Sequence, residues 1–380
     1  MAETVIEKCL LSKPNVRPHG QMIACGVFAD SAVQKLDLVV QKDIINTAAR
    51  LFGRKSADEQ IFRALILVKK RGQDRVRRHG IEMTHLSGGS HIGAIMSVAD
   101  IIAVLYADIL HFDPDNPKSD TRDRFILSKG HAGASIYAAL AENGFFNVDE
   151  LKTHYQNGSR LSGHVSHHVP GVDFSTGSLG HGLSAAVGMA LAAKQDKKQH
   201  KVYVVLGDGE CNEGSVWEAA LFAAHFELDN LVCIVDHNHM QSLDTCDHTL
   251  SSVPLADIWR GFGWNTVEID GHDHAQLHDA LVSPAISGKP TVIVAHTIKG
   301  KGVSFMENDI LWHYRFPHDG WEYDLAVTEL HRVKPTDVID PYTPNGIENP
   351  VLPNEDADIY RDHTISATYH PTWFGKEKTE

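Results

Sequence analysis

A carboxylate and an amide follow two neighbouring apolar runs of this sequence, at positions where they could share a cation. Asp208 lies in the segment Gly-Asp-Gly-Glu-Cys-Asn-Glu-Gly (207–214), directly after the apolar run 202–206. Asn238 follows the next, largely apolar run, 231–236. If both runs are strands of a parallel sheet, their carboxyl ends lie side by side, where ligands usually bind. Mg²⁺ takes oxygen ligands and often shares its shell with phosphate groups, so this pattern indicates a magnesium and phosphate site.

The residues around this pair suit a phosphorylated ligand. Gly207 and Gly209 allow the backbone to approach a phosphate closely, and a helix expected over 215–227 would offer free backbone N–H groups to an anion. A diphosphate carries about three negative charges, so its burial requires a compensating cation. Two simpler interpretations stay open: Asp208 as a turn carboxylate that caps the next helix, and Glu213 as an acid that complements the helix dipole.

The composition is typical of a soluble enzyme. With 380 residues, the chain is long enough for one large α/β domain or two ordinary ones. The net charge of −14 argues against a nucleic-acid-binding protein, and it means that a phosphorylated ligand needs a local positive site. The basic run 69–78 is a candidate for that site, although a solvated helix face is the favoured interpretation.

Cysteine usage and the N-terminus predict a cytoplasmic protein that does not cross a membrane. The five cysteines form no C-x-x-C pair, which is typical of reduced thiols; they are Cys9, Cys25, Cys211, Cys233 and Cys246. The apolar run 22–29 is too short and mixed for a signal sequence or a span.

Alternating strands and helices predict an α/β fold, with a parallel sheet covered by helices on both faces. The expected strands are 202–206, 231–236, 264–269 and 291–297, and the expected helices are 97–110, 131–143, 182–195, 215–227 and 274–283. We divide the chain into an N-terminal extension with helices (1–60), a catalytic domain (61–330) and a proline-rich C-terminal tail (331–380).

The Gly-Asp-Gly segment, followed by Asn238 about thirty residues later, resembles the thiamine-diphosphate motif. The surrounding sequence, over roughly residues 60–320, is similar to the N-terminal, diphosphate-binding half of the transketolase family. This resemblance implies a diphosphate-binding (PP-type) domain that holds thiamine diphosphate and Mg²⁺, with Ca²⁺ or Mn²⁺ as substitutes. It also implies that Asp208, Asn238 and the backbone carbonyl of Met240 bind the metal, and that Gly207, Gly209 and Glu210 contact the cofactor.

Four of the 25 histidines lie in motifs that resemble those around active-site histidines of the family. His91 lies in Ser-Gly-Gly-Ser-His-Ile-Gly, His131 in Ser-Lys-Gly-His, and His164 in Leu-Ser-Gly-His, while His313 follows Lys-Gly-Lys-Gly-Val-Ser-Phe and Trp312. The resemblance implies that His91 and His313 handle the C3 hydroxyl proton of a ketose donor. His131 and His164 would bind its carbonyl and C1 hydroxyl. Imidazole titrates near neutrality, so it can both donate and accept these protons.

Further cofactor contacts follow from the same resemblance. Gly177 and Leu179, in Ser-Thr-Gly-Ser-Leu-Gly-His-Gly-Leu (175–183), would line the aminopyrimidine together with His131. Ile298 would pack on the thiazolium ring, or it is an ordinary core residue. Glu213 would couple two active sites through a proton network. The chain departs from the family pattern at Ser178 and His181, neither of which touches a charge-bearing role, and at Ile92, where a less rigid loop is expected.

Histidine pairs elsewhere do not form a recognisable zinc motif. The groups His164, His167 and His168, and His237 and His239, lack the thiolates or carboxylates of a closed site. We therefore expect no zinc there.

The resemblance also implies a partner. In the family, a pyrimidine-binding domain carries a glutamate that activates the cofactor, and this chain ends before such a domain. We therefore expect a second subunit with the pyrimidine-binding and C-terminal domains, in a heterotetramer with two copies of each chain.

The resulting hypothesis is a subunit of a transketolase, which transfers a two-carbon ketol unit from a ketose, often a phosphate, to an aldehyde. Three alternatives stay open: the α subunit of a 2-oxo acid dehydrogenase, an enzyme similar to 1-deoxyxylulose-phosphate synthase, and a non-catalytic regulatory subunit. The four histidines favour the transketolase.

Overall fold

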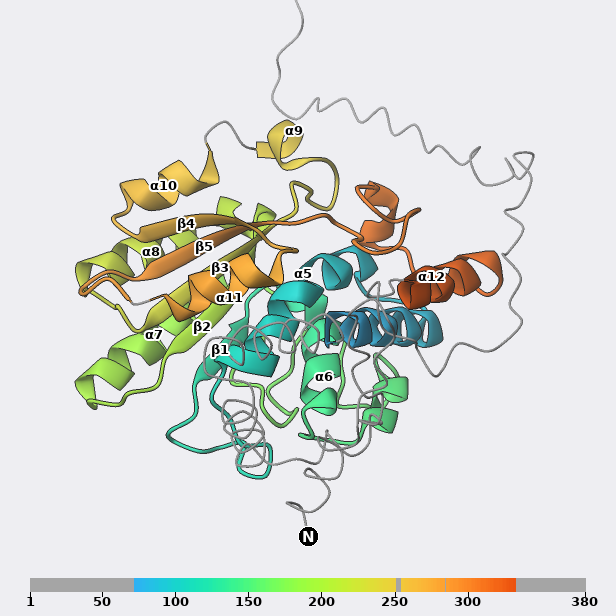
Figure 1. Cartoon of the computed structure of the whole chain (residues 1–380), viewed down its shortest axis with the longest axis horizontal. Coiled ribbons are helices and arrows are strands. Elements are labelled where there is room, and N and C mark those ends of the chain that lie inside the picture. The colour runs from blue at the N-terminus through green and yellow to red at the C-terminus, as the bar shows by residue number, and fades with distance from the viewer. Residues whose placement is uncertain (1–71, 251–253, 284, 333–380) are drawn as a thin grey trace, which may run out of the picture.

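The structure, a computed structural model, describes residues 72–250, 254–283 and 285–332 (Figure 1). The expected extension (1–60) lies outside these residues, and so does all but the first part of the expected tail. The described chain begins in a helix that covers residues 72–87, and it ends in α12 (Trp321–Arg332).

Five parallel strands form one sheet in the order β1-β2-β3-β5-β4. Their bounds are β1 (Arg124–Leu127), β2 (Val202–Gly207), β3 (Leu231–His237), β4 (Asn265–Asp270) and β5 (Thr291–His296). Runs rich in valine and isoleucine form the central strands, because branched side chains pack well when both faces of a sheet are buried. Four strands agree with the predicted ones to within two residues; β1 is short, and its sequence pattern was not recognised as a strand.

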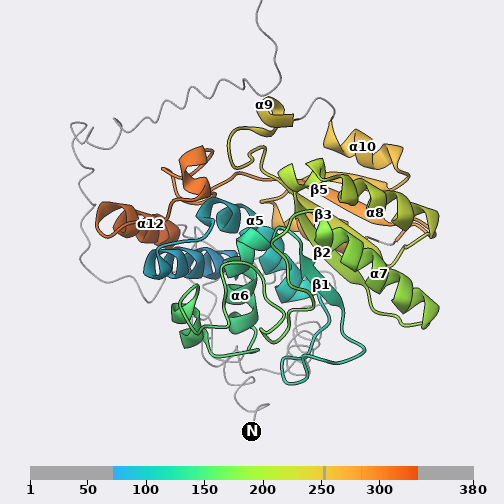
Figure 2. The same ribbon diagram turned by 180° about the vertical axis from the view of Figure 1, so that it is seen from behind.

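Helices cover both faces of the sheet, as Figures 1 and 2 show. One layer contains α5 (Ile92–Val104), α6 (Gly133–Glu142) and α11 (His274–Val282). The other contains α7 (His181–Gln195), α8 (Gly214–His225) and α10 (Leu255–Gly261). Alternate strand residues point into two separate apolar cores: Val232 and Ile234 face the α5 layer, whereas Cys233 and Val235 face the α8 layer. The predicted α/β fold with a doubly covered parallel sheet is confirmed.

Short helices shape the loops between these elements. They are the π-helix Leu105–Ile109, the 3₁₀ helices Gly130–Ala132, Val148–Thr153, Gly209–Asn212 and Ile310–His313, and α9 (Cys246–Leu250). The sequence patterns did not indicate α9, α10 or α12.

The helix α5 is a core element. Together with the π-helix it spans Ile92–Ile109, a stretch with a mean hydropathy of 1.9, which is long and apolar enough to cross a membrane. However, 83% of this stretch is buried inside the fold, and every residue of α5 itself is buried. Its N-terminus, at His91, lies at the edge of the sheet where the site forms.

The described part of the basic run 69–78 is neither a free phosphate patch nor a solvated face. Arg77 is 4% exposed and forms a buried ion pair with Asp100 of α5, with Nη2 2.5 Å from Oδ2. Arg75 pairs with Glu142, and Arg78 donates to the carbonyl of Leu330. Periodicity alone could not show this, because these partners lie far along the chain.

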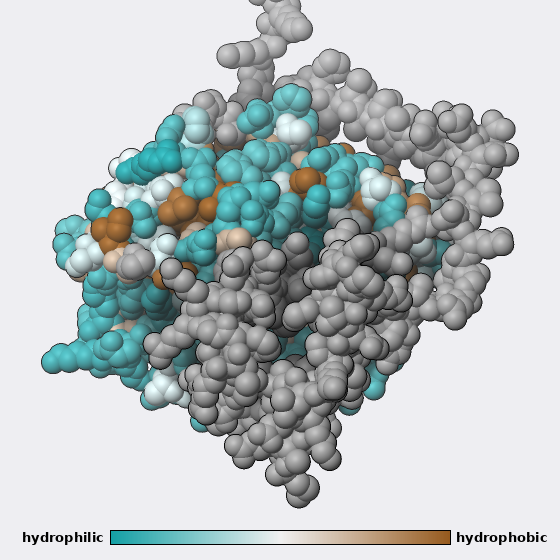
Figure 3. Space-filling model, in the orientation of Figure 1, coloured by the Kyte–Doolittle hydropathy of each residue, from teal (hydrophilic) through white to brown (hydrophobic). Residues whose placement is uncertain are grey.

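On the face shown in Figure 3, the coloured surface is largely hydrophilic and the apolar spots are separate. Most of the large apolar side chains among the described residues are buried in the two cores.

Candidate active site

The segments that follow four strands bring the candidate residues to one edge of the sheet. His131 follows β1, Asp208 follows β2, Asn238 follows β3 and Ile298 follows β5. Because all strands are parallel and neighbouring, these segments lie side by side at the carboxyl edge. The 3₁₀ helix that ends at His313 closes the same edge from the C-terminal side and contacts α5.

The predicted metal ligands form a small, hydrogen-bonded loop. Asp208 and Asn238 are 8% and 4% exposed. Asp208 Oδ1 accepts from the N–H of Gly209 at 2.7 Å, and Oδ2 accepts from the N–H of His239 at 2.6 Å. Asn238 Oδ1 accepts from the N–H of Met240 at 3.1 Å. These bonds wrap the segment after β3 around the end of β2, and the oxygen atoms keep further lone pairs for a cation.

The carbonyl of Met240 already faces a positive charge. Lys299 Nζ lies 3.3 Å from this oxygen, 3.0 Å from the carbonyl oxygen of Gln241 and 2.7 Å from His313 Nδ1. The Lys299 side chain is only 2% exposed, and burial followed by the nearby Lys129 lowers its pKa to about 8. A cation is thus held at a predicted metal ligand, which shows that this oxygen-rich edge fits positive charge.

The electrostatics of Asp208 agree with this fit. Burial, and then the carboxylate of Asp236, raise the pKa of Asp208. A divalent ion bound to this carboxylate would offset both effects. The expected ligands Asp208, Asn238 and the carbonyl of Met240 therefore offer oxygen atoms of the kind that fit Mg²⁺.

A buried ion pair between Lys129 and Asp236 lies next to the carboxyl edge of the sheet. Lys129 Nζ donates to Asp236 Oδ2, and the two side chains are 1% and 0% exposed. Asp236 also accepts from Ser97 Oγ at 2.6 Å and from Thr297 Oγ1. This pair joins the segment that carries His131 to the strand that leads into Asn238.

The four predicted histidines converge on one another. The His91 ring centroid lies 5.2 Å from that of His131, 5.7 Å from His164 and 5.3 Å from His313. Tyr314 adds a fifth ring, 5.1 Å from His91. These residues come from segments up to 223 positions apart (314 − 91), so the fold alone assembles them.

Burial keeps three of these imidazoles neutral near pH 7. Burial and the neighbouring His164 lower the pKa of His91 to about 4, and burial and Lys299 lower that of His313 to about 3. The pKa of His131 also falls well below its ordinary value, through burial and Lys129. A neutral imidazole has one donor and one acceptor. The site can therefore bind hydroxyl groups and accept a proton from one of them.

The glycine loop 175–183 lies next to this cluster. Gly177 has a φ of +152°, and a Cβ there would lie 3.0 Å from the His164 ring. The side chain of Leu179 is partly buried. This position places the predicted cofactor contact Gly177 beside the histidines, whereas Leu179 has no described contact with them.

The two predicted acidic residues, Glu210 and Glu213, differ in burial: Glu210 is buried and Glu213 is exposed. Glu210 is 2% exposed, and its carboxylate accepts from Ser128 Oγ, from Gly180 N–H at 2.9 Å and from Gly207 N–H at 3.1 Å. It links β1, β2 and the glycine loop, so any contact of Glu210 with a ligand falls to its backbone. Glu213 is exposed at the start of α8.

The predicted residue Ile298 is partly buried and held by its backbone. Its N–H donates to His272 Nε2 at 2.8 Å, while His272 Nδ1 bonds to Asp100 Oδ2 at 2.7 Å. Sequence reasoning missed Lys129, Lys299 and Asp236 as parts of the site. All three stand at the ends of strands, and Lys129 and Lys299 lie in the very motifs that carry His131 and His313.

This parallel sheet, with buried oxygen donors and a histidine cluster at one edge, is the arrangement that the sequence predicts for an enzyme of the thiamine-diphosphate class. The family model "Transketolase, thiamine diphosphate binding domain" matches residues 68–314. The chain belongs to the transketolase family, whose members are ketol-transferring enzymes.

The chain is also similar to individual transketolase subunits. The chain is 40% identical to a subunit of the apulose-4-phosphate transketolase of Phocaeicola vulgatus, over 68% of this chain and 92% of that protein. It is 40% identical to the 6-deoxy-6-sulfo-D-fructose transketolase subunit SqwG of a Clostridium species, over 68% of this chain and 94% of that protein.

The fold is also similar to that of a solved transketolase structure. The fold superimposes on transketolase from Campylobacter jejuni with a TM-score of 0.65 and 28% identity, over 70% of this chain and 43% of that one. The chain is therefore the N-terminal subunit of a transketolase, and the family match decides against the two alternatives that belong to other thiamine-diphosphate enzymes.

Proposed function

We propose that this chain binds the diphosphate of thiamine diphosphate through a Mg²⁺ held by Asp208, Asn238 and the carbonyl of Met240. Ca²⁺ or Mn²⁺, which also take oxygen ligands, would replace Mg²⁺. The bound cofactor would supply the electron sink that amino-acid side chains lack. The observation that carries the proposal is the convergence of the four histidines on the edge where these oxygen ligands lie.

We assign the histidines to the ketose donor. His91 and His313, both neutral, accept and return the proton of its C3 hydroxyl. His131 and His164 hold its carbonyl and C1 hydroxyl by hydrogen bonds. Lys299 Nζ lies 2.7 Å from His313 Nδ1, so Nε2 of His313 is the nitrogen that remains available to the donor. General acid–base catalysis of this kind contributes about 10²- to 10⁴-fold in rate.

A second subunit would complete the active site. This chain spans 92% of the Phocaeicola relative but only 43% of the Campylobacter transketolase, which supports a division of the enzyme between two chains. We propose that the partner carries the pyrimidine-binding and C-terminal domains, in a cytoplasmic heterotetramer with two copies of each chain. The exposed Glu213 would lie where two active sites are coupled.

The donor is proposed to be a ketose with a charged group. The names of two relatives specify a sugar phosphate and a sulfo-sugar. The net charge of −14 repels such an anion. Local cations are therefore required to hold it.

The cofactor site is tested with Asp208→Asn, which keeps the shape of the side chain but removes its charge. Calorimetric titration of the full-length chain with thiamine diphosphate in Mg²⁺ should show at least about 100-fold weaker binding. Loss of a group that merely supports a metal ligand already costs about 10- to 100-fold. Asp257→Asn, at a side chain 58% exposed and paired with Arg260, is the matched control and should bind normally.

Catalysis is tested with His313→Asn in the complex of the chain and its partner. Ketol transfer should fall by about 10²- to 10⁴-fold while cofactor binding stays normal. If the chain were a non-catalytic regulatory subunit, the opposite result would follow: transfer by the complex would be unchanged in both Asp208→Asn and His313→Asn. That outcome would refute the proposed function.

A further inference from the structure

Three histidines that the proposed function does not use meet on the α10 side of the sheet. His237 ends β3 and His296 ends β5, and the two are register partners in adjacent parallel strands. They continue the alternation of Cys233 and Val235 on β3, so their side chains face the α8 and α10 layer, opposite to Asp236. His239, two residues after His237, has a φ of +64°, and this turn brings its ring back over the strand end.

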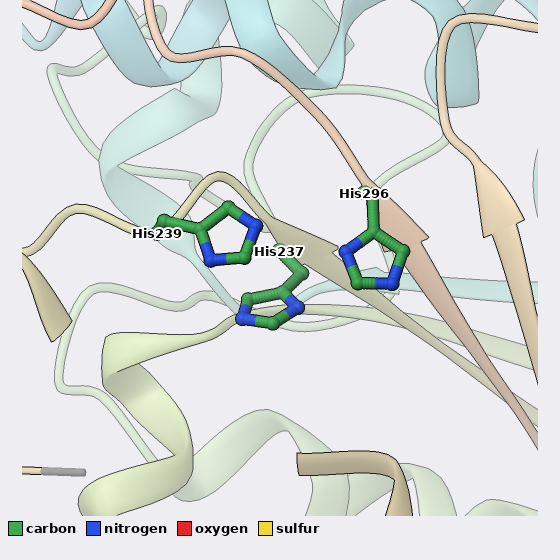
Figure 4. Close-up of side chains that lie close together, drawn as sticks. All are labelled: His237, His239 and His296. Atoms are coloured by element: carbon green, nitrogen blue, oxygen red, sulfur yellow. The ribbon is translucent and has the colours of Figure 1, made fainter. Parts of the chain in front are cut away.

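The rings present nitrogen atoms to a common point, as Figure 4 shows. One nitrogen of each ring lies within 4.8 Å of the other two. The His237 ring centroid lies 4.0 Å from that of His239 and 5.0 Å from that of His296. His237 Nδ1 is buried and has no hydrogen-bond partner among the described residues. A buried polar atom without a partner is costly, and a metal ion bound at this nitrogen would remove that cost.

The spacing is close to that of a bound metal. Zinc binds histidine at about 2.0–2.1 Å, which places ligand nitrogens about 3.4 Å apart in a tetrahedron. Small ring rotations that move each nitrogen by less than about 1 Å toward the common centre would bring the nitrogens from within 4.8 Å of one another to about 3.4 Å apart. Three imidazoles and an open fourth position for water form a recognised zinc arrangement. The sequence pair His237 and His239 was judged insufficient for zinc, and only the fold adds His296.

A carboxylate, Glu268, lies next to one histidine of this cluster, as in many metal sites. Glu268 of β4 lies on the same face, with Oε2 3.4 Å from His296 Nε2. In Figure 4 the other nitrogen of His296 points toward the two neighbouring rings. Carboxylates that bond to the second nitrogen of a metal-binding histidine fix its orientation and raise its basicity. Glu268 also pairs with Arg260, which holds the carboxylate in place.

We infer that His237, His239 and His296 bind one transition-metal ion of the zinc class, with Glu268 as the supporting carboxylate. This site differs in chemistry from the proposed Mg²⁺ site, because imidazole suits Zn²⁺, Co²⁺ or Ni²⁺ and oxygen ligands suit Mg²⁺. The two sites are neighbours in space, since the N–H of His239 donates to Asp208 Oδ2 at 2.6 Å. A metal on the histidines therefore stiffens the segment that holds the Mg²⁺ ligands.

The test is a titration of the full-length chain, with any affinity tag removed, in excess Mg²⁺. Zn²⁺ should bind with one ion per chain, measured by calorimetry, and Co²⁺ should give the visible absorption of a tetrahedral complex. His296→Gln and His239→Gln should each weaken Zn²⁺ binding by at least about 100-fold, and Glu268→Gln by about 10- to 100-fold. Unfolding curves confirm that each variant is folded.

The matched control is the double variant His167→Gln with His168→Gln. Those two exposed rings are also adjacent, with centroids 4.2 Å apart, and belong to no three-histidine cluster among the described residues. The double variant should keep the Zn²⁺ affinity and the Co²⁺ spectrum. The inference is overturned if no ion binds in excess Mg²⁺, or if the control loses binding as much as His296→Gln. Binding that disappears in Asp208→Asn but persists in His296→Gln would also overturn it. Failure of the proposed function leaves these measurements unaffected, because none depends on thiamine diphosphate.

Discussion

Replacement of Asp236 by Asn tests whether the buried ion pair holds the catalytic edge together. Asp236 and Lys129 are 0% and 1% exposed, so the substitution leaves a buried ammonium without its counter-charge. Removal of one partner of a buried pair costs about 3–5 kcal/mol. The amide oxygen of Asn can still accept from Ser97 or Thr297, so we expect a loss near the lower end, about 3 kcal/mol.

The assay is urea unfolding followed by circular dichroism, with thiamine diphosphate affinity as a second measurement. The control, Asp229→Asn, disrupts the pair with Lys194, whose side chains are 31% and 37% exposed; it should cost less than about 1 kcal/mol. Cofactor binding should weaken only in Asp236→Asn, because the pair joins the segments of His131 and Asn238.

A double variant separates lost charge balance from lost hydrogen bonds. Lys129→Met combined with Asp236→Asn removes the unpaired ammonium, so it should be more stable than Asp236→Asn alone. Equal unfolding midpoints for Asp236→Asn and Asp229→Asn would refute the argument. The pH dependence has a definite sign: burial raises the pKa of Asp236, but the charge of Lys129 and the hydrogen bonds from Lys129, Ser97 and Thr297 together lower it below its ordinary value. The pair therefore stabilises the fold at neutral pH, and this stabilisation is lost as pH falls through and below about 4.

Three further predictions follow from local geometry. Gly130→Ala should destabilise the fold by about 1–3 kcal/mol in urea unfolding, because a Cβ would lie 2.5 Å from the backbone of Thr176; Gly188→Ala, with no atom within 4 Å in α7, should instead stabilise it by about 0.5–1 kcal/mol. Burial lowers the pKa of His154 from 6.5 to about 4, so this side chain by itself should contribute a loss of stability of up to about 3 kcal/mol between pH 7 and pH 4. His154→Leu should flatten that slope, and an unchanged slope would refute the assignment. Chelation of Mg²⁺ should abolish tight thiamine diphosphate binding in the native chain and have no further effect on Asp208→Asn, as calorimetry would show.

Much of the fold was predictable because the chemistry that forms it is local. Runs of branched apolar residues, such as 202–206 and 231–236, can be buried on both faces only in a covered parallel sheet. Glycine and polar residues directly after those runs mark the strand ends, so the position of Asp208 and Asn238 followed from the sequence. The strand β1 was missed because four residues that begin with an arginine show no clear pattern.

Motif similarity located the histidines, but it could not show how they interact. His91 and His313 meet because the N-terminus of α5 and the last 3₁₀ helix both reach the carboxyl edge. Their low pKa values arise from burial and from Lys299, which depend on packing in space. The basic run was misjudged for the same reason, since the partner of Arg77 lies on α5.

The amino-acid sequence by itself determined four of the five strands, the main helices of the sheet layers apart from α10, the family and the residue types available for chemistry, because these depend on neighbours along the chain. Only the tertiary structure decided which charges are buried in pairs, such as Lys129 with Asp236, and which histidines share a point in space. The strand register places His296 beside His237, and no spacing along the chain expresses a register between strands. The three-histidine cluster is therefore a property of the folded sheet.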